Sequence, residues 1–290
     1  MTGGIFIAKF LVWFIRFLPH RIALCFGRFL GRILRLVLWK KVDRCEARCV
    51  KALGVGITEA RKIIRGSFIN MGMSAVEFIR LPEMKSNVKN FMTFDEKSIN
   101  FLKEALNRGK GVLLMVSHMD NWELAAMRVH AEGFPRINAV YTPQRNQGGI
   151  NDIIMDIRLN NIGMTMTGSE GAELRKIFRT LKNNGIVAIM QDLDARKDGV
   201  ITKFFGLPAS THDGIIKLHE KFGSAIIPVH CVRDKNNPAH HNIIFTEILS
   251  DRKNFDLQIC NEVIEGWIKE NPSQWFWILD RWEYTLGKKI

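Results

Sequence analysis

The first 42 residues of this chain contain no aspartate and no glutamate. The basic residues of the same stretch are Lys9, Arg16, Arg21, Arg28, Arg32, Arg35, Lys40 and Lys41. Much of the formal net charge of +13 is therefore placed at this end of the chain. A segment with basic side chains and no acidic ones indicates an anionic partner, such as a membrane surface or an acidic molecule.

The N-terminal region also lacks an apolar run of the length that a simple membrane span requires. Its first apolar stretch, residues 5–18, has 14 residues and includes Lys9 and Arg16, whereas a spanning helix needs ~20 apolar residues. No small-residue cleavage site follows it, because residues 18–21 read Leu-Pro-His-Arg, which argues against a secretory signal peptide. The many phenylalanines and leucines argue against a nucleic-acid-binding arm, which is usually polar and mobile.

Large apolar side chains and arginines alternate with helical spacing in residues 21–41. Arg28, Arg32 and Arg35 would share one face of a helix. The apolar side chains of another face are Phe26, Phe29, Ile33 and Val37. A basic amphipathic helix of this kind suits a membrane interface with anionic headgroups. We therefore predict that residues 1–42 form a basic, apolar, helical region that anchors the protein to a membrane.

Cysteines are few and odd in number. They are Cys25, Cys45, Cys49, Cys231 and Cys260, scattered over helical or apolar contexts. This pattern argues against a disulfide scaffold and indicates a reducing compartment. Cys45 and Cys49 are one helical turn apart but lack further ligands in the pattern, and His240 and His241 are expected in a polar loop. We therefore expect no metal site.

No internal repeat and no low-complexity linker interrupts the chain, which favours a single domain over residues 43–290. Buried strands are predicted at residues 112–116, 138–141, 164–167, 186–190 and 225–229. Helices are predicted at residues 58–81, 96–108, 122–132, 150–160, 169–183, 213–222 and 255–269. Strands separated by segments of helical length predict an α/β domain with a mainly parallel central sheet and flanking helices. A late edge strand is expected at residues 241–247.

The stretch around His118 is the first candidate for chemistry. Residues 112–116 are wholly apolar, as in a strand buried on both faces, and His118 follows at the carboxyl end, where open α/β sheets bind ligands. Asp120 is a suitable N-cap for the next helix, which would place Glu123 at its third position. Two interpretations remain open from spacing alone. The two residues form a catalytic pair, or His118 is a turn histidine and Glu123 completes a capping box.

Other candidate side chains are expected at the same edge of the sheet. Arg145 would present its guanidinium to an oxyanion or a phosphate, unless it is a solvated loop residue. Asp192 ends the fourth strand, where it would orient a base, bind a substrate hydroxyl or cap a turn. Residues 204–211 are expected to form an apolar loop that runs into a helix start at Thr211. The backbone amides of this loop would hold an anion, and its two phenylalanines would either line an acyl chain or plug the core. Its candidate residues are Phe204, Phe205, Gly206 and Thr211.

In combination, these features resemble a known family. The matching blocks are Phe68-Ile69-Asn70-Met71-Gly72 with Glu77 and Phe78; Ser117-His118 through Trp122-Glu123; Tyr141, Pro143 and Asn146; Asp192 with Asp198-Gly199-Val200; Phe204-Phe205-Gly206 with Pro208, Ala209 and Thr211; Ala225 to Pro228; and Pro272 to Trp277 with Arg281-Trp282. This ordered series is similar to the late acyltransferases of lipid A biosynthesis, the lauroyl and myristoyl transferases of the lysophospholipid-acyltransferase-like superfamily. It extends over nearly the whole chain and includes the H-x4-[D/E] motif at His118 and Glu123.

The resemblance implies a glycerol-3-phosphate acyltransferase-like fold and an O-acyltransferase mechanism. His118 would be the general base, and Glu123 would hold its imidazole in the useful tautomer. The family carries an arginine directly after the tyrosine of its Y-R-P segment, and here that position is Thr142. Arg145 or Arg158 would therefore stabilise the oxyanion instead. The family's Asp-Gln pair is Asp192-Leu193 here, so the aspartate carries over and the glutamine does not.

The resemblance also implies the partners and the location. The donor would be an acyl carrier protein loaded with a C12 to C14 chain, and the acceptor a lipid A precursor. The catalytic domain would lie on the cytoplasmic side of the bacterial inner membrane. No cofactor, metal or nucleic acid is expected. The alternatives are an acyl-CoA-dependent acyltransferase for another glycolipid or lysophospholipid, and a non-catalytic lipid-binding membrane protein, which the His118 and Glu123 pair disfavours.

Overall fold

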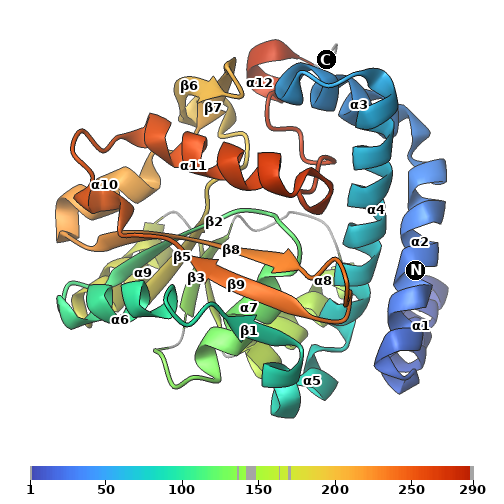
Figure 1. The fold of residues 1–290 in the computed structure, drawn as a ribbon. Helices are drawn as coiled ribbons and strands as arrows, with labels where there is room; N and C mark the ends of the chain where they lie inside the picture. Colours follow the sequence, from blue (N-terminus) through green and yellow to red (C-terminus); the bar gives the residue numbers. More distant parts are fainter. Residues whose placement is uncertain (1, 136, 142–147, 163, 169–170, 288–290) are drawn as a thin grey trace.

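The computed structural model describes residues 2–135, 137–141, 148–162, 164–168 and 171–287. A seven-stranded sheet forms its centre (Figure 1). In spatial order the strands are β1 (Met92–Phe94), β9 (His241–Phe245), β8 (Ala225–Arg233), β2 (Val112–Val116), β5 (Ile186–Met190), β3 (Ile137–Tyr141) and β4 (Thr165–Gly168). Neighbouring strands run parallel except β8 and β9, which are antiparallel. The predicted α/β class with a mainly parallel sheet is confirmed.

Two details of the sheet correct the sequence prediction. Strand β9 lies between β1 and β8, so it is not the edge strand that we expected at residues 241–247. The edge position belongs to β1, whose three residues are too short a run for a recognisable strand pattern. Short edge strands are common in native sheets because they limit unwanted pairing with other chains.

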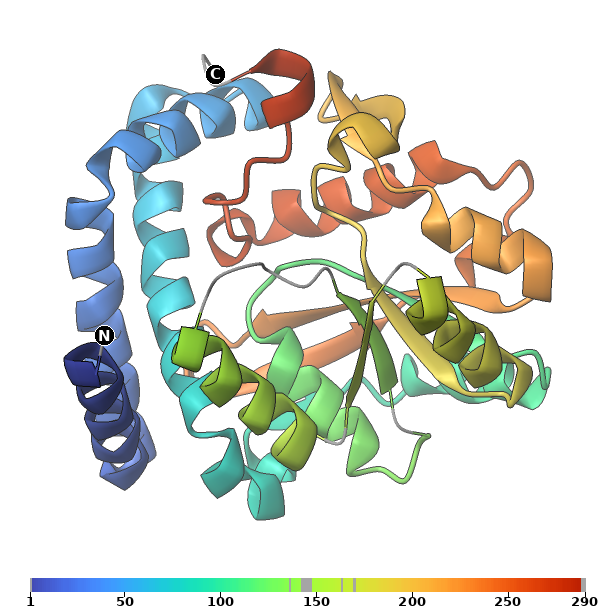
Figure 2. The ribbon, with the colours of Figure 1, turned by 180° about the vertical axis from the view of Figure 1, so that it is seen from behind.

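Helices cover both faces of the sheet (Figure 2). The α-helices are α1 (Thr2–Phe17), α2 (His20–Val37), α3 (Trp39–Leu53), α4 (Ile57–Ile79), α5 (Leu81–Met84), α6 (Ile99–Asn107), α7 (Trp122–His130), α8 (Gly148–Ile157), α9 (Gly171–Lys182), α10 (Gly214–Phe222), α11 (Leu257–Glu270) and α12 (Glu283–Leu286). Shorter helical turns are η1 (Lys85–Asn90), η2 (Arg158–Ile162), η3 (Arg196–Asp198), η4 (Leu249–Asp251) and η5 (Pro272–Gln274).

The central strand β2 explains why two cores form. Leu113 and Met115 pack in one buried cluster with α9, α10 and α11. Val112 and Leu114 point the other way, into a second cluster with α6, α7 and α8. Because successive side chains of a strand face opposite sides, a wholly apolar strand must be covered on both faces. The C-terminal end of β2 is thereby fixed between two packed layers.

A small hairpin corrects the expectation for residues 204–211. Strands β6 (Val200–Phe204) and β7 (Leu207–Thr211) pair antiparallel instead of forming an apolar loop, and the next helix, α10, begins only at Gly214. The connection is Phe205-Gly206, both with positive φ angles of 53° and 73°. A two-residue turn with two positive φ angles matches the twist of a hairpin.

The N-terminal helices pack along one side of the molecule. Helix α2 lies close to α4 because glycines stand where the two backbones meet: a Cβ on Gly31 would be 2.3 Å from the carbonyl oxygen of Phe68. Arg80, just after α4, donates hydrogen bonds to the carbonyls of Ile15 and Arg16 at 2.7 and 2.8 Å. Across the described part of the chain, no helix is both long enough and apolar enough to cross a bilayer.

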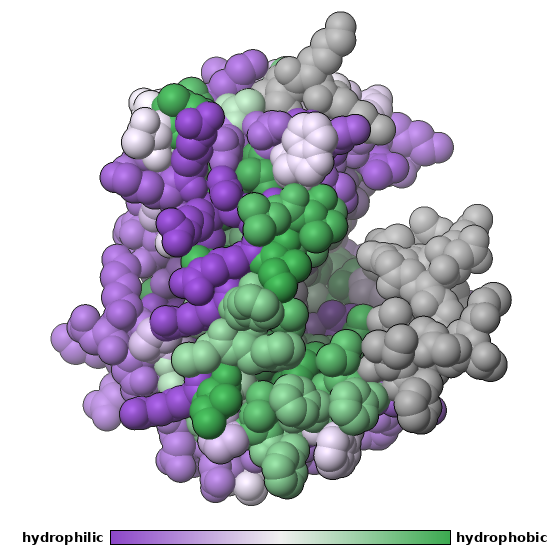
Figure 3. All heavy atoms as spheres, turned by 90° about the vertical axis from the view of Figure 1, so that its right-hand side faces the viewer, coloured by the Kyte–Doolittle hydropathy of each residue, from purple (hydrophilic) through white to green (hydrophobic). Residues whose placement is uncertain are grey.

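Large apolar side chains are exposed on these N-terminal helices, and they gather on one face of the molecule (Figure 3). They are Phe10, Leu11, Trp13, Phe17, Ile22, Phe29, Leu30, Ile33, Leu34, Leu36, Val37 and Trp39. We call this set the N-terminal apolar face. Exposed apolar surfaces of this extent usually mark a binding surface.

Candidate active site

The turn after β2 places His118 at the carboxyl edge of the sheet. Asn121 is the N-cap of α7, since its side chain accepts a hydrogen bond from Leu124 N at 3.0 Å. Asp120, the predicted N-cap, is instead fully buried with a positive φ of 49°. Glu123 is therefore the second residue of α7 and not the third. The capping-box interpretation of Glu123 is thus wrong, because it required the cap at Asp120.

Asp192 holds the imidazole of His118. His118 Nδ1 lies 2.8 Å from Asp192 Oδ1, and the backbone N of His118 donates to Asp192 Oδ2 at 2.7 Å. Trp275 Nε1 donates to the same Oδ2 at 2.8 Å. Burial alone would raise the pKa of Asp192, but the facing His118 and these hydrogen bonds bring that pKa below its usual value.

The state of Asp192 decides the tautomer of His118. An ionised carboxylate only accepts hydrogen bonds, so Nδ1 of a neutral imidazole must carry the proton. Nε2 is then left as the basic nitrogen. Of the three roles that we predicted for Asp192, orienting a base is the one that this geometry fits. The side chain of His118 is 16% exposed, so a substrate can reach the imidazole ring.

Glu123 does not hold the imidazole. Its Oε1 accepts hydrogen bonds from Arg158 Nε and Nη2 at 2.8 and 2.6 Å, and in the described residues no hydrogen bond or ion pair joins it to His118. Glu123 therefore does not have the orienting role that we predicted. Asp192 has it instead, because its carboxylate contacts Nδ1 of His118 and leaves Nε2 for the reaction. Glu123 Oε2 is buried and has no hydrogen-bond partner in the described part of the chain.

A cavity of about 1040 Å³ adjoins these side chains. His118, Glu123 and Arg158 line it together. Much of the remaining wall is apolar, including Val116, Ala125, Ala139, Met166 and Ala188. A large pocket with apolar walls and a few convergent polar groups is typical of a site for an apolar ligand with one reactive end.

The other predicted binding residues fall into two groups. Phe204, Phe205, Gly206 and Thr211 belong to the β6–β7 hairpin and do not line this cavity. Phe204 is fully buried against Trp275 and Trp282, which fits the core-plug alternative and corrects the expectation that it lines an acyl chain. Arg145 lies outside the described residues.

Thr211 is occupied by the protein itself. Its hydroxyl lies 2.6 Å from that of Thr202 and accepts from Arg281 Nη2 at 2.5 Å. These partners leave it buried within the hairpin's base, so the predicted anion site at a helix start around Thr211 does not form.

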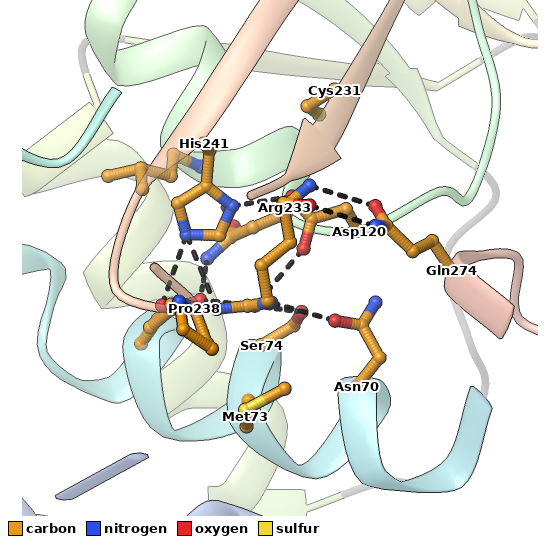
Figure 4. A network of polar contacts seen from close by, with 12 residues as sticks. Asn70, Met73, Ser74, Asp120, Cys231, Arg233, Pro238, His241 and Gln274 are labelled. Carbon is orange, nitrogen blue, oxygen red and sulfur yellow. Dashed lines mark hydrogen bonds and ion pairs between the residues drawn. The ribbon is translucent and has the colours of Figure 1, made fainter. Parts of the chain in front are cut away.

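A second buried polar cluster lies behind the turn (Figure 4). His241 Nδ1 is 2.5 Å from Asp120 Oδ2, and Arg233 Nη2 is 2.8 Å from Glu77 Oε2. Burial alone would lower the pKa of His241, but the carboxylates of Asp120 and Glu77 raise it to about 9. His241 thus begins strand β9 as a buried cation, whereas the sequence suggested a polar loop. Among the described residues, no group of histidine, cysteine and carboxylate side chains is arranged to hold a metal.

The model of the bacterial lipid A biosynthesis acyltransferase family matches residues 1–284. The chain belongs to this family. It is 29% identical over 138 residues to a phosphatidylinositol mannoside acyltransferase of Mycobacterium tuberculosis, covering 46% of this chain and 42% of that protein. It is 23% identical over 183 residues to a lipid A biosynthesis acyltransferase of Haemophilus influenzae, covering 62% and 56%. The chain spans about half the length of the curated relatives it matches.

In this member of the lipid A biosynthesis acyltransferase family, sequence reasoning missed two supports of His118. Trp275 reaches Asp192 from 83 residues away, and Met119 pairs with Trp275 as an isolated β-bridge. The aromatic run at residues 275–277 was a visible signal, but nothing in its spacing pointed to Asp192. For Asp120 the sequence indicates only a helix cap, because its buried partners are 113 and 121 residues distant in sequence.

Proposed function

We propose that this protein transfers a fatty acyl chain from a thioester donor to a hydroxyl of a lipid A precursor. The observation that carries the proposal is the Asp192-held His118 at an apolar cavity, together with membership of the family. The donor is an acyl carrier protein, and the chain is of C12 to C14 length. The whole reaction rests on groups that the protein supplies, and the proposal includes no cofactor.

The proposed chemistry is general-base catalysis. His118 Nε2 accepts the proton of the acceptor hydroxyl while the hydroxyl oxygen attacks the thioester carbon. The new C–O bond forms, the C–S bond breaks, and the departing thiolate takes the proton back from His118. Asp192 stabilises the imidazolium that forms in between, and a positioned base of this kind contributes roughly 10²- to 10⁴-fold in rate.

Arg158 is the proposed oxyanion donor among the described residues. Its guanidinium lines the cavity, and Glu123 holds it through two hydrogen bonds to one carboxylate oxygen. A preorganised cation costs no reorganisation when negative charge develops on the carbonyl oxygen. In this proposal Glu123 acts on the reaction by fixing Arg158. Arg145 stays a second candidate from the sequence.

We also propose that the N-terminal apolar face rests on the cytoplasmic side of the bacterial inner membrane. Trp13, Phe17 and Trp39 are more than half exposed there, and the same region has no acidic residue up to Val42. Aromatic and basic side chains together favour the interface of a membrane with anionic headgroups.

A second acceptor is favoured by the names of the relatives. Proteins from Mycobacterium tuberculosis and Mycolicibacterium smegmatis that match this chain are phosphatidylinositol mannoside acyltransferases. The alternative proposal is therefore the same acyl transfer to a different glycolipid, with acyl-CoA as the donor. The His118 chemistry is common to both alternatives, so only the acceptor and the donor separate them.

Mass spectrometry of lipids decides between these acceptors. The protein, its His118→Ala variant and a His240→Ala control are expressed in a strain that lacks its late lipid A acyltransferases. His240 lies beside β1, outside the cavity lining. We expect lipid A to gain one acyl mass with the wild type and the control only. A gain on another glycolipid supports the alternative, and a gain that persists in His118→Ala contradicts the catalytic assignment.

A further inference from the structure

Four buried ionisable side chains, those of Glu77, Asp120, Arg233 and His241, form a ring of contacts next to His118. Figure 4 shows Asp120, Arg233 and His241 of this ring. Arg233 Nη2 lies 2.8 Å from Glu77 Oε2 and 3.1 Å from Asp120 Oδ1. His241 lies 3.1 Å from Glu77 Oε1 and 2.5 Å from Asp120 Oδ2. The ring therefore alternates two carboxylates with the guanidinium of Arg233 and the imidazole of His241. Arg233 Nη1 also lies 3.4 Å from His241 Nε2, so the two carboxylates hold these two groups next to each other.

Asp120 is the member of this ring that belongs to the catalytic turn. It follows His118 by two residues and precedes the N-cap of α7. Its φ of 49° lies in the left-handed region, which residues other than glycine seldom adopt. Such a conformation is strained and persists only where surrounding contacts enforce it. Here the contacts are those of its carboxylate with Arg233 and His241.

Arg233 also fixes the segment that runs along the turn. Its backbone N donates to Gln274 Oε1 at 2.8 Å, and Gln274 Nε2 donates back to the Arg233 carbonyl at 2.9 Å. The carbonyl of Gln274 accepts from Asp120 N at 2.9 Å, and Phe276 N donates to the carbonyl of His118 at 3.1 Å. The side chain and the backbone of Asp120 are thus both tied to the same arginine.

Stability alone is a weak reason for such a ring. A buried ion pair gains little over well-packed apolar side chains of the same volume, because both charges must leave water. Glu77, Asp120 and His241 are fully buried, and Arg233 is 4% exposed. An apolar cluster would hold α4 against β8 and β9 equally well. An apolar cluster would not, however, fix the direction of the backbone between His118 and α7.

We propose that the ring positions His118, with Asp120 and Arg233 as positioning residues for the proposed acyl transfer. The ring sets the left-handed turn at Asp120, and the turn sets where the His118 imidazole stands between Asp192 and the cavity. The kinetic consequence of this inference rests on the proposed function. The geometric consequence, which concerns the imidazole itself, does not.

Asp120→Asn is the decisive substitution, because asparagine tolerates the left-handed region while the charge is lost. Asp120→Gly tests the same point if the first variant does not fold. The matched control is Glu46→Gln. Glu46, on α3, is a buried carboxylate too, and it pairs with Arg35 of α2 and Arg61 of α4, outside the cavity lining. Both substitutions remove one buried charge from a two-partner ion cluster, so general destabilisation is common to both.

The first readout is ¹⁵N NMR of histidine-labelled protein in detergent, with the His118 signals identified by their absence in His118→Ala. We expect Asp120→Asn to reduce the Nδ1-protonated tautomer of His118, and Glu46→Gln to leave this tautomer unchanged. A folded Asp120→Asn or Asp120→Gly variant with an unchanged His118 tautomer would overturn the proposal.

The second readout is the rate of acyl transfer. We expect Asp120→Asn to lower kcat by roughly 10- to 100-fold, as a small misplacement of a reacting group does, with KM changed less than about threefold. In the His118→Ala background the same substitution should cause no further loss. An equal loss in both backgrounds contradicts positioning through His118. If the wild type transfers no acyl chain but the change in tautomer appears, the proposed function fails and the positioning role stands.

Discussion

His118 Nδ1 and Asp192 Oδ1 lie 2.8 Å apart, although 74 residues separate them in the sequence. Two adjacent parallel strands create this contact, since β2 and β5 pair in register from Val112 with Ile186 to Val116 with Met190. The two strands therefore end at the same level of the sheet, and His118 and Asp192 each follow two residues after the last pair. The acid that orients the histidine thus comes from the neighbouring strand and not from the following helix.

Asp192→Asn should lower kcat by roughly 10²- to 10³-fold, because the imidazolium loses its counter-charge and an amide has only one oxygen for the N–H groups that face both carboxylate oxygens of Asp192. Binding of the lipid should change little. The comparison is Asp194→Asn, which removes a carboxylate two residues further along without a contact to His118. Steady-state kinetics of both variants checks this. Equal kcat values in the two variants would count against the orienting role.

Arg158→Ala should lower kcat by roughly 10²- to 10³-fold if its guanidinium stabilises the oxyanion. Glu123→Gln should have a smaller effect, because the amide keeps one acceptor for Arg158. The double variant should then lose little more than Arg158→Ala alone, since residues of one ion pair act as a unit. A complete double-mutant cycle measures this coupling. Additive losses would show that Glu123 acts on the reaction independently of Arg158.

Ala188→Leu should shift the enzyme toward shorter acyl chains. Ala188 lies opposite Ala139 in the register of β5 and β3, and both line the cavity. A leucine there fills space that a methylene chain would occupy, which should favour shorter donors by roughly 10- to 100-fold. Competition between donors of different length, read by mass spectrometry, measures the shift. Ala131→Leu at the exposed end of α7 is the control, and an unchanged preference in Ala188→Leu would contradict the cavity assignment.

Gly31→Ala should destabilise the folded protein by about 1–3 kcal/mol, because its Cβ would stand 2.3 Å from the carbonyl oxygen of Phe68. Gly266→Ala is the matched control inside α11, where an added Cβ meets nothing within 4 Å. There the better helix propensity of alanine should be neutral or stabilise by up to about 1 kcal/mol. Thermal unfolding in detergent compares the two. Similar melting temperatures would argue against the close packing of α2 on α4.

Stability should fall as the pH rises through the titration of His241. The folded protein holds the pKa of this histidine at about 9, above its ordinary value of 6.5, so it binds more protons than the unfolded chain between these values. The contribution is fully present below pH 6.5 and is lost as the pH rises through about 9. Melting temperatures of the wild type and His241→Gln over this window test it. A slope that is the same in both proteins would refute the role of His241.

Local patterns predicted several elements correctly. The apolar run at residues 112–116 is strand β2, and the predicted helix at residues 58–81 is α4, from Ile57 to Ile79. The hairpin escaped prediction because Phe204 and Leu207 read as an apolar loop, and only their partners across the strand pair reveal β6 and β7. Strand pairing depends on contacts between distant residues, which periodicity along the chain does not encode.

By itself, the sequence determined the α/β class, the position of His118 at a strand end, and a basic apolar N-terminal region, because each follows from side-chain patterns within one element. The tertiary structure alone decided the partners of the site: Asp192 holds His118, Arg158 holds Glu123, and Asp120 is buried with Arg233 and His241. The physical reason is that a hydrogen bond or an ion pair is set by distance in space. These pairs arise only once strand order and helix packing have brought remote segments together.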